Sequence, residues 1–531
     1  MLTTWVPTVV VAALLAAAGC GADAGVAADA AAAGDAGPGD TAAAAADAAP
    51  PADGGVVDLV LYHTADEHGW LEPASDGAWV WGGAANVGGW LRQEGFDPAR
   101  DLLLSGGDNW TGPAISTWFA GAPVVAAMND LGYAATAIGN HEFDFGQDTL
   151  RARVAQARFA VLGANVRDAA TGAVADFATE YTLAEVSGVT VGVIGLTTPA
   201  TAYDTMPKNV AGLDFAPLAQ TLVALVPTVR AAGAEVVVVL AHESFGPMLD
   251  LADTLPVRVD ALFAAHDHIN RQVVQGGIPV VASSWAWHGY TVTTLAFDRG
   301  ARAVVDATTR FVAVRYPDGE PDPVTPDPQT AATVAAARAQ ADAALGEQLG
   351  TTVTGLPLGP ALGNWATDAW RWAYPAADVA IQNLGGLRQG LAPGAVTLGD
   401  VVSVLPFENS IYQLRLTGAQ LVANLATVTA GCPVAASCWP AVSGLTWTGS
   451  GGTIAVRVGG APLDPAATYT VLVHDYIYSA SSGWLFASQD PAPIDLGVNY
   501  RQPAVDWTRQ LGTSAADPLE AHVDPAPRWA E

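Results

Sequence analysis

Three polar side chains follow one short apolar segment and are spaced so that they could share a site. Residues 134–138 are apolar except for Thr136, and Asn140, His141 and Asp144 come shortly after them. They offer an amide oxygen, an imidazole and a carboxylate. Loops at the carboxyl ends of strands carry the chemistry of α/β folds, so this stretch is a candidate site. Taken alone, it is equally well explained by an Asn-His turn with Asp144 capping the next helix.

Four further stretches repeat this arrangement, each polar and each just after an apolar segment. Two of them contain pairs with i, i+2 spacing, which places both side chains on the same side of an extended segment. Singly, such residues are often turn or cap residues, but their recurrence at five successive strand ends is not expected by chance. Five of the nine histidines lie in the five stretches. The residues of the four further stretches are Asp66, His68, Asp108, His242, His266 and His268.

The side-chain types indicate the ligand of this predicted site. Carboxylates, imidazoles and an amide, with no thiolate, suit zinc, manganese or another borderline divalent ion. Asp108 lies on a glycine-rich turn and has two oxygens, so it is the candidate to bridge two ions. Two ions about 3.5–4 Å apart can activate a water and clamp phosphoryl oxygens for in-line displacement. The seven candidate ligands are Asp66, His68, Asp108, Asn140, His242, His266 and His268.

Strand-like and helix-like segments alternate through the first part of the chain. Helix-length segments such as residues 216–232 lie between several of the strands, which predicts α/β layers with a largely parallel core sheet. At 531 residues the chain is too long for one hydrophobic core, so we expect a second domain, which mixes strands and helices from about residue 351. Strands are predicted at residues 57–62, 102–105, 134–138, 159–162, 189–196, 236–240 and 261–263.

The N-terminus has the pattern of an export signal. Residues 6–18 are apolar but too few to span a membrane, and Ala17-Ala18-Gly19-Cys20 is similar to the lipobox of bacterial lipoproteins. Residues 1–7 lack Lys and Arg, and Ala17 stands where Leu is usual, so plain cleavage is the alternative to a lipid on Cys20. We expect an exported protein, in the periplasm or on the cell surface, with membrane attachment through Cys20.

Composition divides the rest of the chain and restricts its partners. The 52 acidic residues against 22 basic ones give a net charge of −30, which argues against nucleic-acid binding but not against a small phosphorylated substrate. We expect a monomer. Cys432 and Cys438 predict one disulfide that staples a surface loop. The expected segments are a signal peptide (1–20), a tether rich in Ala, Gly, Asp and Pro (21–55), a first domain (56–315), a linker and connecting helix (316–350), a second domain (351–518) and a tail (519–531).

The motifs, in this order along the chain, resemble the calcineurin-like metallophosphoesterases. The forms at residues 63–69 and 140–146 resemble more narrowly the bacterial 5′-nucleotidase family, which includes UDP-sugar hydrolases and cyclic-nucleotide phosphodiesterases. The resemblance covers nearly all of residues 57–500. It implies a layered α/β metallophosphoesterase sandwich followed by a separate α+β 5′-nucleotidase C-terminal domain that binds substrate. The motifs are Asp66-Glu67-His68, Gly107-Asp108, Gly139-Asn140-His141-Glu142, His242 and His266-Asp267-His268.

The resemblance also assigns roles in a dinuclear site. One ion would be held by Asp66, His68, Asp108 and His268, and the other by Asp108, Asn140, His242 and His266. His141 would be the catalytic imidazole, oriented by Asp144; a protonated His141 could stabilise the transferring group or protonate the leaving oxygen. A hydrogen bond that only stabilises the fold is the alternative. His63, His288 and His474 are expected to be structural. Ala264-Ala265-His266 departs from the Gly-Gly-His that is common in the family.

Residues 362–369 and 381–388 are similar to signatures of the family's C-terminal domain. The resemblance implies that Asn383 and Arg388 hold substrate, together with Asn140, and that Phe407 and Tyr476 stack on the two faces of a nucleobase. A plain turn and two core aromatics are the alternatives. Ser482 stands where the family has a ribose-binding Asp, and Ala361 lies where some members have a basic contact. We therefore expect complete metal chemistry with altered nucleotide recognition.

These observations predict an exported dinuclear-metal phosphoesterase that hydrolyses nucleotides or related phosphomonoesters through in-line attack by a metal-bridging water. Three alternatives stay open. The substrate could be another phosphoester, such as a UDP-sugar or a cyclic nucleotide. The chain could cleave a thiosulfonate bond, since residues 107–112 are similar to sulfur-oxidising relatives. It could also be a non-catalytic surface binding protein, although the full ligand set with His141 argues against this.

Overall fold

The computed structural model describes residues 55–434, 436–449, 454–479 and 483–530. The predicted signal peptide with Cys20, almost all of the tether and Ser482 lie outside the described residues. No helix in the described part of the chain combines the length and the apolar character needed to cross a bilayer.

Two six-stranded sheets form the centre of the first domain. In the first sheet, β1 (Val56–Thr64), β4 (Leu102–Ser105), β5 (Ala135–Ala137) and β6 (Ala160–Leu162) are parallel, and β15 (Gly289–Asp298) and β16 (Ala303–Ala313) extend it antiparallel. In the second sheet, β9 (Val189–Thr197), β11 (Val236–His242), β12 (Ala261–Ala264) and β14 (Ile278–Ser283) are parallel, flanked by antiparallel β8 (Tyr181–Val186) and β13 (Asn270–Gln275).

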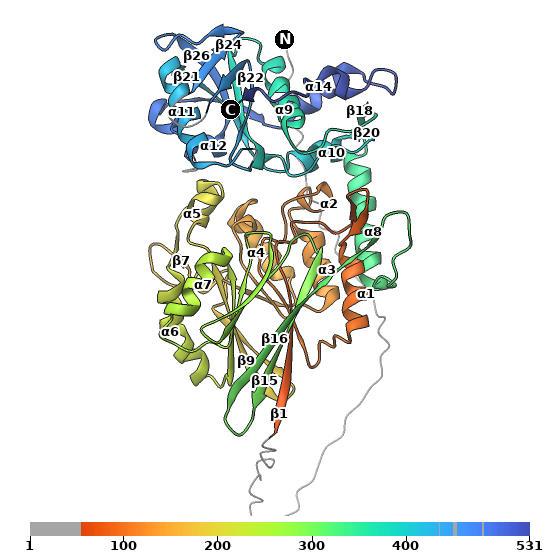
Figure 1. Cartoon of the computed structure of the whole chain (residues 1–531), viewed down its shortest axis with the longest axis vertical. Coiled ribbons are helices and arrows are strands. Elements are labelled where there is room, and N and C mark those ends of the chain that lie inside the picture. The colour runs from red at the N-terminus through yellow and green to blue at the C-terminus, as the bar shows by residue number, and fades with distance from the viewer. Residues whose placement is uncertain (1–54, 435, 450–453, 480–482, 531) are drawn as a thin grey trace, which may run out of the picture. The chain divides into compact units, whose positions relative to one another are not determined.

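The sheets pack face to face because their strands are apolar on both sides, as expected for parallel strands covered on both faces. Leu61 and Leu104 of the first sheet meet Val238 and Phe263 of the second in one fully buried layer. The helices α1 (Ala84–Glu94), α3 (Ala122–Leu131), α4 (Gln147–Gln156) and α8 (Pro328–Leu345) cover the outer face of the first sheet, and α6 (Leu218–Ala231) and α7 (Phe245–Thr254) cover the second (Figure 1). The predicted layered α/β architecture is confirmed.

The second domain is α+β, as predicted, and is built on a five-stranded mixed sheet. Its strand order is β22 (Pro440–Ser443), β19 (Val379–Asn383), β26 (Thr468–His474), β21 (Ser410–Thr417) and β27 (Ile494–Asn499). One face packs against α9 (Pro360–Ala373), α10 (Leu398–Val404) and α14 (Gln502–Leu511). The other packs against α11 (Gly418–Gly431) and a small sheet that includes β23 (Leu445–Thr448) and β24 (Ala455–Val458).

The segment expected to be a linker is part of the first domain. Its first residues form β17 (Arg315–Pro317), which pairs with β3 (Trp79–Trp81). The helix predicted at residues 329–349 is α8, whose N-terminus is capped by the Asp327 carboxylate accepting from the Thr330 N–H at 2.8 Å. Buried residues of α8 belong to the core of the first domain. The connecting helix is therefore fixed on the first domain.

The residues expected to form a tail belong to the second domain. The strand β28 (Trp529–Ala530) pairs with β23, and the Asn364 side chain donates to the carbonyl of Asp524 at 2.8 Å. Arg528 forms a forked ion pair with Asp368, with nitrogen–oxygen distances of 2.7 and 2.6 Å. The second domain thus extends past residue 518.

Replacing Arg528 should destabilise the second domain. In Arg528→Ala, Asp368 keeps only the Ser443 hydroxyl as a donor, in a place where its side chain is 24% exposed. We expect the free energy of unfolding to fall by about 1–3 kcal/mol in a chemical denaturation followed by tryptophan fluorescence. The exposed pair of Arg509 with Glu347 is the control, since Arg509→Ala should cost about 1 kcal/mol or less. Equal losses in the two variants would contradict a special role for Arg528.

Candidate active site

The carboxyl ends of five parallel strands bring the predicted ligands together. The loops after β1, β4 and β5 in the first sheet meet those after β11 and β12 in the second. Three groups have ligand atoms within 4.8 Å of one another, and shared residues connect the groups into one cluster. Asn140 completes the set, with its Oδ1 3.2 Å from His242 Nε2. The groups are Asp66 with His68 and His268, His68 with Asp108 and His141, and Asp108 with His242 and His266.

Five of the seven predicted ligands have left-handed backbone conformations. Residues other than glycine rarely adopt such backbone angles. Each costs on the order of 1–3 kcal/mol and persists only where the surrounding structure enforces it. Hydrogen bonds between the loops do this: the N–H groups of Asp66 and His68 donate to the carbonyls of Gly107 and Asp108, both at 3.0 Å. The φ angles are 54° at Asp66, 44° at His68, 58° at Asp108, 72° at His266 and 57° at His268.

The hydrogen bonds of two histidines direct their free nitrogens into the cluster. A backbone carbonyl can only accept, so His242 Nδ1 donates to the Gly106 carbonyl at 3.0 Å and His68 Nδ1 donates to the Thr111 carbonyl at 3.1 Å. This leaves Nε2 of each ring for the centre, as second partners of metal-ligating histidines do. His68 Nε2 lies 2.9 Å from His268 Nε2, and His242 Nε2 lies 3.0 Å from Asp108 Oδ2.

The electrostatics of the cluster favour a cation. Burial opposes a charge on His242, but the carboxylates of Asp108 and Asp66 outweigh it and raise its pKa to about 10. In the protein alone, the proton on His242 therefore supplies the positive charge that balances the Asp108 carboxylate. Burial lowers the pKa of His266 to about 4 and that of His268 to about 3, so both offer neutral nitrogens. Neutral imidazoles around buried carboxylates form a donor set that fits divalent metal ions.

His141 and Asp144 lie beside this cluster and form a pair. His141 Nδ1 is 2.7 Å from Asp144 Oδ2, and the His141 backbone N–H donates to Asp108 Oδ1 at 2.8 Å. The Thr205 hydroxyl donates to the other oxygen of Asp144 at 3.2 Å. Burial works against a charged ring, but the charges of Asp144 and Asp108 prevail, and the pKa of His141 is raised. The pair therefore favours a protonated His141 with its Nε2 available to another molecule.

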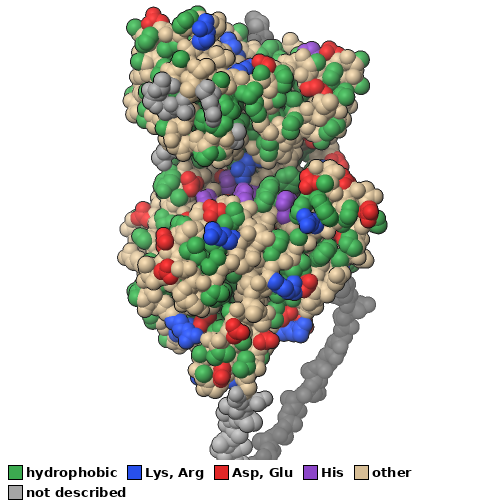
Figure 2. All heavy atoms as spheres, viewed as in Figure 1, with side chains coloured by type: hydrophobic (Ala, Val, Ile, Leu, Met, Phe, Trp, Pro, Cys, Tyr) green, Lys and Arg blue, Asp and Glu red, His purple; other side chains and the backbone are tan. Residues whose placement is uncertain are grey.

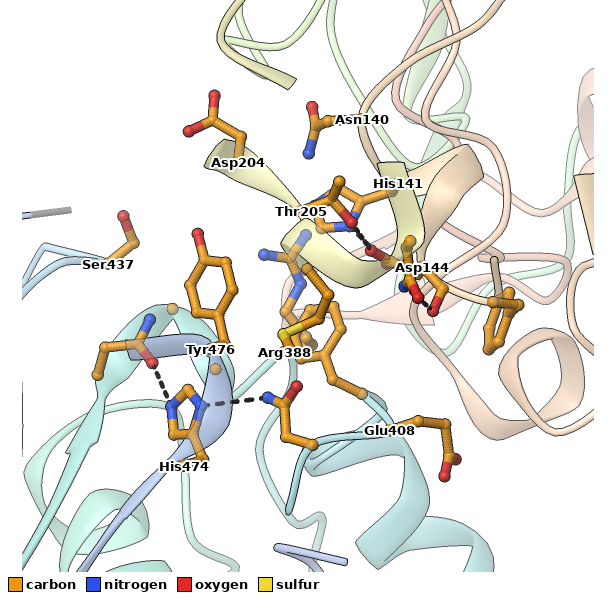
Figure 3. A pocket seen from close by; sticks show the side chains of 18 of the residues that line it. Asn140, His141, Asp144, Asp204, Thr205, Arg388, Glu408, Ser437, His474 and Tyr476 are labelled. Atoms are coloured by element: carbon orange, nitrogen blue, oxygen red, sulfur yellow. Dashed lines mark hydrogen bonds and ion pairs between the residues drawn. The ribbon is translucent and has the colours of Figure 1, made fainter. Parts of the chain in front are cut away.

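A cavity of about 640 Å³ adjoins the cluster and has walls from both domains. Figure 2 shows histidine side chains and a basic side chain gathered in a hollow on the visible face. Asn140, His141 and Asp144 meet residues of the second domain in this cavity (Figure 3). The Phe407 ring stacks on His141 at 5.8 Å between centroids, and the Arg388 guanidinium lies 5.8 Å from the Phe407 ring. All the residues predicted to bind substrate line the cavity, namely Asn140, Asn383, Arg388, Phe407 and Tyr476.

Comparison with known proteins shows which families the chain is similar to. The 5′-nucleotidase C-terminal domain model matches residues 335–488. The chain is 26% identical over 427 residues to the endonuclease YhcR of Bacillus subtilis, which covers 74% of the chain and 34% of that longer protein. It is 24% identical to the 5′-nucleotidase of Vibrio cholerae, covering 83% of the chain and 88% of the relative. A solved 5′-nucleotidase precursor of Thermus thermophilus matches with a TM-score of 0.76 and 26% identity, over 89% of this chain and 99% of that one.

Residues 335–488 match the 5′-nucleotidase C-terminal domain, and most of the chain is similar to 5′-nucleotidases. It spans only 34% of the length of the endonuclease relative, whereas it covers nearly the whole of the Thermus structure. The chain has a compact cluster of candidate ligands despite its Ala264 and Ala265. The Ala265 methyl packs where a Cβ on Gly106 would come within 2.7 Å of it, so glycine at 106 accommodates the alanine.

Two buried acids hold the loops of the candidate ligand cluster, and sequence reasoning did not single them out. Glu142 Oε2 accepts from the N–H groups of Asp108 at 2.8 Å and Gly139 at 2.7 Å, and its Oε1 accepts from Asn109 at 2.7 Å. Glu67 accepts from the hydroxyls of Thr64 and Ser105, and burial raises its pKa to about 7. Both acids lie inside the motifs quoted in the sequence analysis. The motifs do not show, however, in which direction the two side chains point.

Other cavity residues carry no sequence signal or were assigned elsewhere. Asp204 and Lys208 line the cavity from the first domain, and Lys208 Nζ is 3.6 Å from Asp475 of the second. The Cys432–Cys438 disulfide is confirmed, but its loop does more than staple the surface. Ser437 and Cys438 line the cavity, and the Ser437 carbonyl accepts from the Gly385 N–H at 2.6 Å. His474, expected to be structural only, also lines the cavity.

Replacing Glu142 should weaken the junction between the Asp108 loop and the Asn140 loop. Glu142→Gln keeps the shape but turns an NH₂ group toward backbone N–H donors, which leaves buried donors unpaired. We expect the free energy of unfolding to fall by about 1–3 kcal/mol in urea denaturation. Glu320→Gln, an exposed change outside the cavity, is the control and should have almost no effect. A wild-type midpoint for Glu142→Gln would show that this carboxylate does not hold the loops.

Proposed function

We propose that the protein is an exported, metal-dependent phosphoesterase that hydrolyses nucleotides or related phosphomonoesters. The observation that carries the proposal is the convergence of seven carboxylate, imidazole and amide ligands beside the His141–Asp144 pair, in the wall of a cavity with aromatic residues. Similarity to 5′-nucleotidases supports the same reaction class. Export rests on the apolar N-terminal segment, and a lipid on Cys20 would hold the enzyme at a membrane.

The donor set divides naturally around Asp108, whose two oxygens can serve two ions. Asp66, His68 and His268 lie on one side of it, and Asn140, His242 and His266 lie on the other. When bound, a pair of divalent ions lowers the pKa of a water and stabilises phosphoryl oxygens during in-line displacement. Zinc and manganese both suit these ligand types.

The residues of the chain supply binding and proton transfer. Arg388 brings a guanidinium that suits anionic phosphoryl oxygens, and Asn140 reaches both the ligand cluster and the cavity. The charged His141 can donate its Nε2 proton to the leaving oxygen, while Asp144 fixes the ring and stabilises its charge. Burial lowers the pKa of Arg388. A guanidinium is more weakly hydrated than an ammonium, which suits it to binding a substrate anion.

Phe407 and Tyr476 would hold a flat leaving group such as a nucleobase. Both rings line the cavity from the second domain, and stacking of a base on an aromatic side chain contributes roughly 1–3 kcal/mol. UDP-sugars and cyclic nucleotides stay alternatives within phosphoester hydrolysis, whereas cleavage of a thiosulfonate would be a different reaction. A non-catalytic binding role is disfavoured by the intact His141–Asp144 pair.

Metal dependence tests the proposal directly. Chelation should abolish hydrolysis of nucleoside 5′-monophosphates and of p-nitrophenyl phosphate, and zinc or manganese should restore both. Asp108→Ala should bind neither ion, as measured by elemental analysis, and should stay inactive after metal addition. Asp148→Ala removes a carboxylate whose side chain is fully exposed and should retain wild-type metal content. Full activity at zero metal content would refute the proposal.

His141 should matter for turnover without contributing to metal binding. His141→Ala is expected to keep two ions while reducing kcat by about 10²–10⁴-fold, because the proton donor to the leaving oxygen is lost. Asp144→Asn should give a smaller loss, since it leaves the imidazole in place and removes only its charged partner. His522→Ala, outside the cavity, is the matched control. Unchanged kcat in His141→Ala, with metal content intact, would remove His141 from the mechanism.

A further inference from the structure

His474, at the end of β26, is neither one of the candidate metal ligands nor the predicted proton donor. The side chain is fully buried, and its ring packs against Tyr476, Tyr500 and Trp370. Its two nitrogens contact the amides of two cavity residues: Nε2 lies 3.0 Å from Asn383 Oδ1, and Nδ1 lies 3.3 Å from Asn409 Nδ2. Figure 3 shows His474 joined to a side chain on either side.

The chemistry of imidazole restricts what these amides can offer to a ligand. Burial lowers the pKa of His474 to about 3, so the ring is neutral and has one donor and one acceptor. Asn383 Oδ1 can only accept, so Nε2 donates to it, and Nδ1 accepts from Asn409 Nδ2. The two amides are therefore locked in opposite orientations. Asn383 keeps its NH₂ group for the cavity, and Asn409 keeps its carbonyl oxygen.

The arrangement differs from that of a histidine that only fills the core. His63 is also fully buried, and neither of its ring nitrogens has a hydrogen-bond partner within the described residues. His474 instead uses both nitrogens on side chains that line the cavity. The two aromatic residues predicted to stack on a base lie close in sequence to these polar side chains. Asn409 follows Phe407 by two residues, and Tyr476 follows His474 by two residues. The same part of the second domain thus presents both the aromatic rings and the oriented amides to the cavity.

We propose that His474 is a positioning residue that determines which leaving groups the cavity accepts. By fixing Asn409 as an acceptor, it selects nucleobases whose edge carries an amino group over those with a carbonyl oxygen at the same place. A freely turning amide would serve both kinds equally well. This inference rests on the proposed function, since it names the substrate class of the same site.

Adenosine and inosine 5′-monophosphate test the proposal, because at the edge in question one base carries an amino group and the other an oxygen. We expect the wild-type kcat/KM to favour the adenosine compound by roughly tenfold or more, since an oxygen placed against Asn409 Oδ1 leaves two acceptors opposed. In His474→Phe the amides can turn, so the ratio should fall toward one. p-Nitrophenyl phosphate, which has no base, gives the reference rate for each variant.

Asn409→Ala provides a second reading if His474→Phe does not fold. It removes the acceptor while His474 stays in place, and the ratio should again approach one. His522→Phe replaces an imidazole outside the cavity that pairs with Asp517, and it should keep the wild-type ratio.

The outcomes separate this inference from the proposed function. A wild-type protein that hydrolyses p-nitrophenyl phosphate but does not discriminate between the two nucleotides overturns the role of His474 alone. So does a His474→Phe or Asn409→Ala variant that loses activity on both nucleotides equally and keeps their ratio. A wild-type protein that is inactive on every phosphoester, with metal supplied, overturns the proposed function and this inference with it.

Discussion

Asp108 carries a carboxylate that is 1% exposed, at the place where the loops of the two sheets meet. A buried charge is costly unless opposite charge or hydrogen-bond donors surround it. Burial raises the pKa of Asp108, but His242 and His141 outweigh this effect and the net shift is downward. The anion therefore persists. It is the main cause of the raised pKa of His242, and it adds to the effect of Asp144 in raising the pKa of His141. The buried Asp108 carboxylate therefore helps to set the charge of the histidines around it.

Holding the charge there requires the architecture of both sheets. Asp108 and Asn140 follow strands of the first sheet, and His242 and His266 follow strands of the second. Neither sheet alone could surround the carboxylate. The loops reach it through left-handed backbone at Asp66, His68, Asp108, His266 and His268, and through the three N–H groups bound by Glu142. Local strain is thus offset by buried hydrogen bonds between segments that are distant in sequence.

The sequence allowed prediction of features that depend on local pattern. The strand at residues 102–105 is β4 without a change of bounds, and the ligand types follow from short motifs at strand ends. Features that depend on tertiary contacts could not be predicted. Glu142 lies beside His141 in sequence, yet only the fold shows that it faces inward. Lys208 enters the cavity from a segment without a motif, and Trp529 and Ala530 form a strand by pairing with distant β23.

One histidine in each domain shows how the surroundings set the charge of an imidazole ring. His141 faces two carboxylates, and its raised pKa suits a proton donor, whereas His474 has no charged partner and stays neutral between two amides. The first state suits bond breaking and the second suits recognition. The candidate ligand cluster comes entirely from the first domain, and Phe407, Tyr476, Asn383 and Asn409 come from the second. Under the proposed function, changes in the second domain can therefore alter the leaving group while Asp108 and its partners are left intact.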